Sequence, residues 1–223
     1  MERKLYERNE KRMTERWERK HEALFTAAAR HPFIKAVRDG AVPFSSFKAY
    51  LGQEHWLARN AIVPFLSNLL PESNEDASLI QTGIRFRNAD QIPCLEKEAN
   101  NAEDPLQPTQ DLSKFLRSLV GPEANYVVGL AVLWAMESVY HRGFSHCLED
   151  GSRAPAETKE ACRKWADEWF GNYCLSLQSA ADRALAEISD DVVAKAEVAV
   201  LQLLEIVVEV WNANMRTMQP NAI

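Results

Sequence analysis

The sequence predicts an all-α protein, and three observations lead to this prediction. Only 8 glycines occur among 223 residues, and stretches of alternating apolar and polar residues, the pattern of half-buried strands, are missing. Apolar residues recur instead at helical spacing along most of the chain. The segment 126–136 is apolar nearly all round, which is typical of a central helix covered by neighbours on every side. We therefore expect a single bundle of about seven or eight helices.

The N-terminal region predicts one long helix and one short one. Residues 2–29 combine an apolar stripe with a charged outer face, and Pro32 follows the end of this helix. The first 17 residues could form a frayed extension. A short helical turn over 33–40 ends at Gly40, which is typical of a left-handed C-terminal cap.

Prolines punctuate the next two helices. The segment 45–70 keeps helical spacing on both sides of Pro64, so we expect a kink there and not an end. The segments 75–87 and 93–100 predict a broken helix with Pro93 at the break.

The C-terminal half predicts four more helices. A short one covers 111–120, and the central helix lies within 123–149. The clearest turn follows at Gly151. A long helix over 155–187 comes next, and Ser189 begins the capping sequence of the last helix, which runs through Trp211.

Composition and charge narrow the functional classes. The net charge is −6 with acidic and basic residues mixed, which argues against a nucleic-acid-binding surface. The four cysteines are scattered without a CxxC pair, so we expect reduced thiols in the cytoplasm. The N-terminus has no apolar signal region, and the central apolar run is too short to span a bilayer. No repeat or composition shift divides the chain, so we expect one domain over 1–223.

Two glutamates stand within apolar helix faces. Glu137 interrupts the central helix, where a stranded charge would be costly, so it must be paired, hydrogen-bonded or protonated. It is either a structural carboxylate or a catalytic or ligand-binding one. Glu54 poses a similar choice. Its spacing alone favours a solvent-facing pair with Arg59 or Lys48 over a carboxylate that faces a pocket.

The remaining motifs point to no cofactor. Glu137 and His141 share one helix face, as metal ligands could. Their spacing differs from the Glu-x-x-His of diiron bundles and no second pair occurs, so we expect no metal. Cys147 lacks a His–acid partner at triad-like positions. Glu205 and Glu209 lie four apart among apolar residues of the last helix, and a water-facing stripe explains them as well as a functional pair does.

Two parts of the chain resemble the TenA family, the thiaminase II proteins. The segment RHPFIKAVRDGAVPFSSFKAYLGQEHW resembles the opening of that family. The segments ANYVVGLAVLWAMESVYHRGFSHCLEDGSRAP, WFGNYCLSLQ and KAEVAVLQLLEIVVEVWN are closer still to its plant-type branch. The resemblance covers nearly all of the chain after about Glu18. It implies a heme-oxygenase-like helical bundle without heme, assembled as a dimer or tetramer, with a deep pocket between the helices.

The resemblance also implies a reaction. The family hydrolyses aminomethyl- or formylaminomethyl-pyrimidines to hydroxymethylpyrimidine, which salvages a thiamin breakdown product. Many members use a cysteine nucleophile, whereas the plant-type branch depends on a glutamate. Val132 stands at the cysteine position here, and Glu137 matches the plant-type glutamate. The resemblance thus implies that Glu54 holds the substrate's amino group and that Glu137 acts as the acid/base or water-orienting carboxylate.

Three positions depart from the family pattern. Glu54 replaces an aspartate and is one methylene longer, which shifts its contact by about 1.5 Å and can slow a reaction strongly. Leu57 stands where an aromatic residue stacks on the substrate, and Val207 stands at the catalytic glutamate of the last helix. The expected substrate-binding residues are Tyr50, Leu57, Val132, Tyr140, Trp169 and Val207.

Three hypotheses about function remain open. The first is a C–N hydrolase that acts on aminopyrimidines. The second is a divergent paralogue that binds or processes another small molecule, which the departures favour. The third is a metal oxygenase that uses Glu54, Glu137 and His141.

Overall fold

The structure, a computed structural model, describes residues 12–70, 76–99, 104–121 and 124–217. All regular elements in these ranges are helical, which confirms the predicted fold class. Two of them, η1 and η2, are short π-helical segments. In chain order the elements are α2 (Met13–Lys20), α3 (Glu22–Ala29), α4 (Pro32–Arg38), α5 (Phe44–Leu57), η1 (Ala58–Ile62), α6 (Val63–Leu69), α7 (Ala77–Phe86), η2 (Arg87–Gln91), α8 (Ile92–Glu98), α9 (Gln107–Ser118), α10 (Tyr126–His146), α11 (Ala156–Ala166), α12 (Glu168–Ala186) and α13 (Asp190–Thr217).

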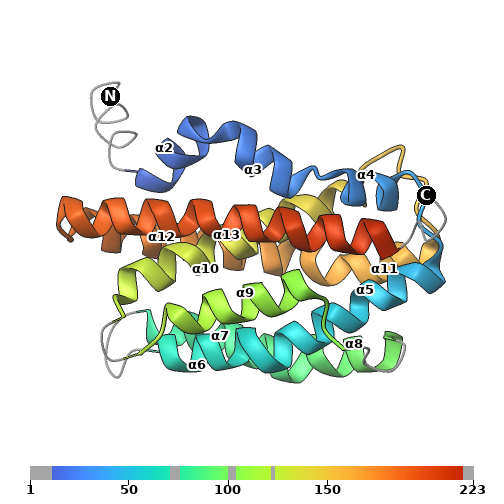
Figure 1. The fold of residues 1–223 in the computed structure, drawn as a ribbon, viewed down its shortest axis with the longest axis horizontal. Coiled ribbons are helices and arrows are strands. Elements are labelled where there is room, and N and C mark those ends of the chain that lie inside the picture. The colour runs from blue at the N-terminus through green and yellow to red at the C-terminus, as the bar shows by residue number, and fades with distance from the viewer. Residues whose placement is uncertain (1–11, 71–75, 100–103, 122–123, 218–223) are drawn as a thin grey trace.

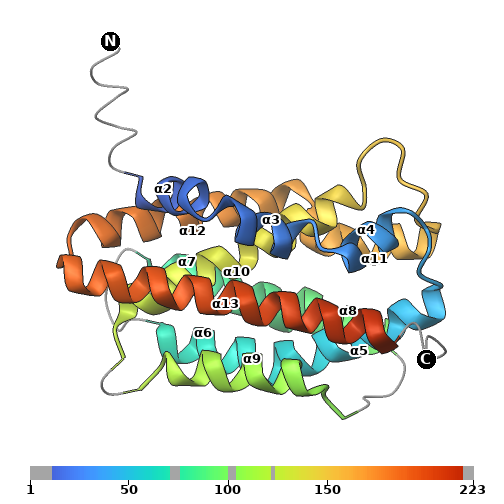
Figure 2. The ribbon, with the colours of Figure 1, turned by 45° about the horizontal axis from the view of Figure 1, so that its top comes forward.

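Helix α10 is the central helix, as its apolar sequence predicts. It contacts α3, α4, α6, α11, α12 and α13, and most of its residues between Val127 and Phe144 are buried. Figure 1 shows α13 running along the length of the molecule beside α10, with α2 to α4 on one side and α5 to α9 on the other. Figure 2 shows the same order of layers after rotation. Side chains on α10 can therefore meet residues from both sides of the bundle.

In each of the two long helical runs of the middle region, a π-helical segment lies just before a proline. Segment η1 precedes Pro64, and η2 precedes Pro93. Proline lacks a backbone N–H, and its ring clashes with the carbonyl four residues earlier in a regular helix. A wider π turn relieves this conflict, and such turns occur often at functional sites. The prediction that the helix continues past Pro64 is confirmed, and the break expected at Pro93 is instead a π turn in a continuous run.

Two predicted long helices are each divided. The predicted helix over 2–29 is divided at His21 into α2 and α3, and its first ten residues lie outside the described part of the chain. The predicted helix over 155–187 is divided at Asp167, whose carboxylate accepts a hydrogen bond from the Phe170 backbone N–H at 2.7 Å. This contact is an N-cap, so Asp167 starts a new helix where the apolar spacing suggested continuation.

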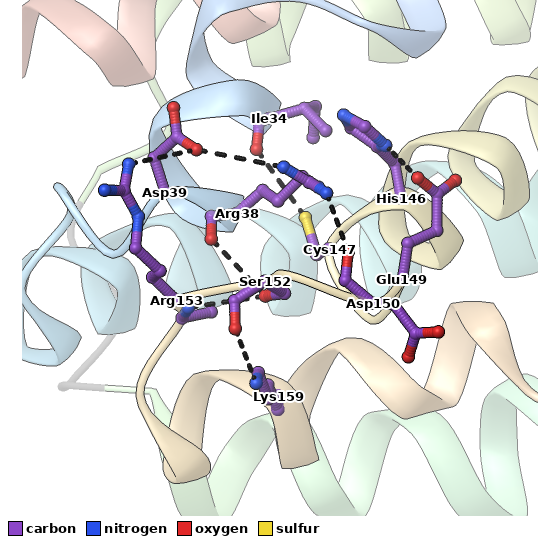
Figure 3. A network of polar contacts seen from close by, with 11 residues as sticks. Ile34, Arg38, Asp39, His146, Cys147, Glu149, Asp150, Ser152, Arg153 and Lys159 are labelled. Carbon is purple, nitrogen blue, oxygen red and sulfur yellow. Dashed lines mark hydrogen bonds and ion pairs between the residues drawn. The ribbon is translucent and has the colours of Figure 1, made fainter.

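The turn after α10 is tied to the end of α4 (Figure 3). The Arg38 carbonyl accepts hydrogen bonds from the Arg153 backbone N–H at 2.9 Å and from the Ser152 hydroxyl at 3.3 Å. The Arg38 guanidinium donates to the Asp150 carbonyl at 3.1 Å. Gly40 has φ of +70°, as the predicted cap requires, and a side chain at this position would run into the Arg153 carbonyl. These contacts fix the C-terminal end of α10 against α4.

The buried apolar residues form one contiguous core around α10. It contains four tryptophans among its largest fully buried side chains: Trp17, Trp134, Trp165 and Trp211. Within the described ranges, no helix is long and apolar enough to cross a bilayer.

Candidate functional site

Glu54 lies on α5 and is buried among apolar side chains. Only 2 % of it is exposed, and the Tyr140 hydroxyl on α10 donates a hydrogen bond to its Oε1 at 3.0 Å. Burial raises the pKa of Glu54 to about 7, because the charged form loses hydration, while the bond from Tyr140 and the positive charge of Arg87 limit the rise. The solvent-facing position that spacing alone favoured is wrong. At neutral pH this carboxyl can both give and accept a proton.

Glu137 lies on α10 and is paired with a buried arginine. Arg87 Nη2 donates to Glu137 Oε1 at 2.5 Å and to Oε2 at 2.7 Å, and both side chains are nearly inaccessible to water. Arg87 Nη1 donates to the Gln91 side-chain oxygen. Glu137 is therefore a paired carboxylate, one of the possibilities that its apolar surroundings required.

Arg87 is a site residue that the sequence did not reveal. It follows α7 as the first residue of η2, and Gln91 is the last residue of this π turn. Both face inward, whereas Asn88, Ala89 and Asp90 between them are exposed. The one available signal was Pro93, since a proline within a helical run predicts a distorted turn just before it.

The two carboxylates belong to one buried cluster. The charges of Arg87 and Glu137 both act on Glu54 and on the Tyr140 hydroxyl. Segment η2 thus meets α5 and α10 in one place. Glu54 and Glu137 therefore lie near one another, and Arg87 lies with them.

Three buried polar atoms around this cluster have no hydrogen-bond partner in the structure. They are the hydroxyls of Tyr50 and Tyr173 and the Nε2 of Gln91. The Tyr50 hydroxyl faces Glu54 closely enough to lower its pKa, although the geometry falls short of a hydrogen bond. Buried polar groups are normally paired with protein or water, so unpaired groups beside Glu54 and beside the ion pair are typical of a place that receives a ligand or water.

The expected substrate-binding residues divide into two groups. Those on α5, α10 and α13 are all buried: Tyr50, Leu57, Val132, Tyr140 and Val207. Trp169 is instead 44 % exposed and lies outside this buried group, so its part in substrate binding stays a prediction. Its ring stacks on Tyr173, with centroids 5.8 Å apart, and lies 4.8 Å from that of Phe86.

Tyr173 takes the inner position on α12. It is 5 % exposed, and burial together with the charge of Glu137 raises its pKa well above the ordinary value. Its hydroxyl reaches inward over Gly83, where any side chain would collide with it. Trp169 and Tyr173 lie four positions apart in the sequence, so helical spacing alone does not separate them. Only packing showed which of them faces the ion pair.

The last helix presents an apolar wall. Val207 is fully buried, and Glu205 and Glu209 are exposed, as the water-facing stripe predicts. On α10, His141 Nδ1 forms a hydrogen bond with the Trp165 carbonyl at 2.7 Å. The described residues contain no group of three His, Cys, Asp or Glu side chains that could hold a metal ion.

The fold and the cluster together define a class of protein: an α-helical bundle that shelters a small polar site between its central helices. The chain belongs to the TENA/THI-4/PQQC family, whose model matches residues 94–218. It is 40 % identical over 212 residues to a Glycine max protein described as a "Probable bifunctional TENA-E protein". That match covers 90 % of this chain and 92 % of the relative. The family resemblance seen in the sequence is thus confirmed.

Solved structures agree with this assignment at the level of the fold. A TenA homologue from Pyrococcus furiosus has a TM-score of 0.81 at 14 % identity, covering 91 % of this chain and 99 % of that one. A "putative tena-like thiaminase" from Sulfolobus solfataricus has a TM-score of 0.69 at 13 % identity, covering 88 % and 92 %. The helical bundle is therefore shared even where most side chains differ.

Proposed function

We propose that this protein is a TenA-like hydrolase that cleaves an exocyclic C–N bond of an aminopyrimidine during salvage of thiamin breakdown products. In this reaction water forms a C–O bond to the exocyclic carbon and the exocyclic C–N bond breaks. Ammonia leaves from the aminomethyl compound, and formamide leaves from the formylaminomethyl compound. One group must remove a proton from water, and the leaving nitrogen must be protonated. The observation that supports the proposal is Glu54, a fully sheltered carboxyl with a pKa of about 7.

The contacts of the two glutamates suggest different roles. Both oxygens of Glu137 accept hydrogen bonds from Arg87, so this carboxylate is already engaged by a counter-charge in direct contact. Glu54 carries no such counter-charge in direct contact and titrates near neutrality. We therefore assign proton transfer and the hold on the substrate's amino group to Glu54. Glu137 and Arg87 supply a fixed pair of charges beside it.

The test is turnover by purified protein without added metal. Aminomethyl- and formylaminomethyl-pyrimidine are each incubated with the protein. Hydroxymethylpyrimidine is measured by chromatography, together with the ammonia released from the first compound or the formamide released from the second. We expect turnover by the wild type and a loss of at least about 100-fold in kcat for Glu54→Gln, the usual size of an acid–base contribution. Glu205→Gln, the same change at an exposed position, should leave kcat unaltered. Equal kcat for Glu54→Gln and wild type would refute this role.

A divergent paralogue is the second candidate function. Leu57 and Val207 are buried apolar residues at positions where the family resemblance implies an aromatic and a catalytic glutamate. No turnover of either pyrimidine, combined with measurable binding of one of them, would favour this candidate. Iron or manganese in the purified protein, measured by elemental analysis, would favour a metal oxygenase.

The same resemblance leads us to propose the setting in which the protein works. We propose a single-domain chain over 1–223 that forms a cytoplasmic dimer or tetramer. Sedimentation equilibrium at micromolar concentration tests the assembly, and a purely monomeric protein would contradict it.

A further inference from the structure

A surface hollow of about 780 Å³ lies beside the buried cluster. It is bordered by the segment from α7 to α8 and by the start of α12. Its apolar part includes the rings of Phe86 and Trp169, and its inner part includes Gln91. Cys94 and Lys164 also line it. The hollow therefore connects an exposed aromatic surface with a residue of the cluster.

Gln91 is held in one orientation at the inner end of this hollow. Its Oε1 accepts a hydrogen bond from Arg87, which in turn binds Glu137. A guanidinium has donors only, so the amide oxygen must face Arg87 and the amide nitrogen must point away from it. The residue is 1 % exposed, and its Nε2 has no partner in the structure. Two N–H donors are thus buried, fixed in direction and unused.

The surroundings of these donors suit a flat molecule. The Phe86 and Trp169 rings lie 4.8 Å apart and form an aromatic surface at the hollow. Planar heterocycles stack well on such surfaces. A ring nitrogen carries its lone pair in the plane of the ring, where a fixed side-chain amide at the end of the hollow can donate to it.

We propose that Gln91 determines specificity, because its Nε2 donates a hydrogen bond to a ring nitrogen of a heterocycle that enters through this hollow. The proposal rests on the proposed function for the class of substrate. It adds the entry route, and it assigns to Gln91 a ring nitrogen that Glu54 does not contact. Gln91 replaces hydrogen bonds that this ring nitrogen makes with water, and a ring without that nitrogen would leave the amide unpaired.

The first test compares two ligands by calorimetric titration, so that it does not depend on turnover. The ligands are hydroxymethylpyrimidine and its carbocyclic analogue, in which CH groups replace the ring nitrogens. We expect the wild type to bind the pyrimidine at least tenfold more tightly. In Gln91→Leu this ratio should fall towards one, because leucine offers no donor to the ring nitrogen. Gln81→Leu, the same change at an exposed position of α7, should retain the wild-type ratio.

The outcomes separate this inference from the proposed function. An unchanged ratio in Gln91→Leu, with turnover by the wild type, overturns the inference alone. If the affinity ratio falls to one in Gln91→Leu and the wild type shows no turnover, Gln91 is supported as the recognition residue and the proposed hydrolase activity is overturned. No binding of either ligand by the wild type overturns both. The ratio of the two affinities is informative even if Gln91→Leu loosens the ion pair, because both ligands are measured against the same variant and such a change affects both.

The second test addresses the entry route through Cys94. This thiol lines the hollow and is partly exposed, whereas Cys147, Cys162 and Cys174 are buried. A bulky maleimide on Cys94 should abolish binding of hydroxymethylpyrimidine to the wild type. Cys94→Ala treated in the same way should still bind it. Undiminished binding by the labelled wild type would show that the ligand enters elsewhere.

Discussion

At the scale of single residues, the contact between Glu137 and Arg87 governs the site. Its atoms lie 2.5 and 2.7 Å apart, and almost none of either side chain reaches water. Taking both charges out of water is costly, and their attraction compensates for this cost only while both are present. The pair therefore adds little net stability, but neither residue can be replaced alone without a large loss.

This contact predicts an asymmetry between single and double variants. Arg87→Met should lower the free energy of unfolding by about 3 to 5 kcal/mol, because Glu137 would be left buried and unpaired. The double variant Arg87→Met/Glu137→Leu should recover most of this loss, since neither member of the pair is then left buried without its partner. Urea denaturation at pH 7 measures both. Arg85→Met, an exposed neighbour, is the control. A single variant as stable as the wild type would contradict the buried pair.

At the scale of elements, distorted turns and caps position the site residues. Segment η2 places Arg87 and Gln91 on the inner side of its helix, and Pro93 explains why this turn is wide. Asp167 ends one helix and begins another, so that α12 can direct Tyr173 inward and Trp169 outward. Regular helical spacing would have predicted neither feature.

The cap at Asp167 gives a second stability prediction. Asp167→Ala should destabilise the protein by about 1 kcal/mol, because the Phe170 N–H loses its partner at the helix start. Asp167→Ser keeps a capping oxygen and should retain most of the stability. Thermal and urea unfolding of both variants provide the measurement. Equal stability of the alanine and serine variants would show that the cap contributes little.

At the scale of the whole molecule, the buried Glu54 links folding to pH. Its pKa is about 7 in the folded protein and close to 4.5 when unfolded. Between these values the folded state holds the proton more tightly, so stability falls as pH rises through this window. Below about pH 4.5 the carboxyl is neutral in both states. Above about pH 7 it is charged in both, and the full cost of burying the charge, about 3 kcal/mol, is present.

This pH dependence can be isolated by comparison with Glu54→Gln. The difference in unfolding free energy between that variant and the wild type should grow with pH from about 4.5 to 7 and then level off. All other titrating groups are common to both proteins and largely cancel. A difference that is flat across this window would mean that Glu54 titrates normally, and its proposed role in proton transfer would then be lost.

The sequence by itself determined the class of fold, the family and the central place of α10. These features depend on apolar periodicity and on motifs that are continuous in the chain, so they can be predicted from short segments of sequence. It also identified Glu137 as a carboxylate that needed a partner, and Glu205 and Glu209 as residues that a water-facing stripe explains. Both conclusions concern residues whose own helix already specifies which face is buried.

Tertiary structure alone decided which distant residues meet. Arg87 is 50 positions from Glu137, and Tyr140 is 86 positions from Glu54. The burial of Glu54 and the outward turn of Trp169 likewise depend on neighbours from other helices. Pairing and burial arise when helices pack, and the pKa of Glu54 follows from both, so no pattern within a single helix contains them.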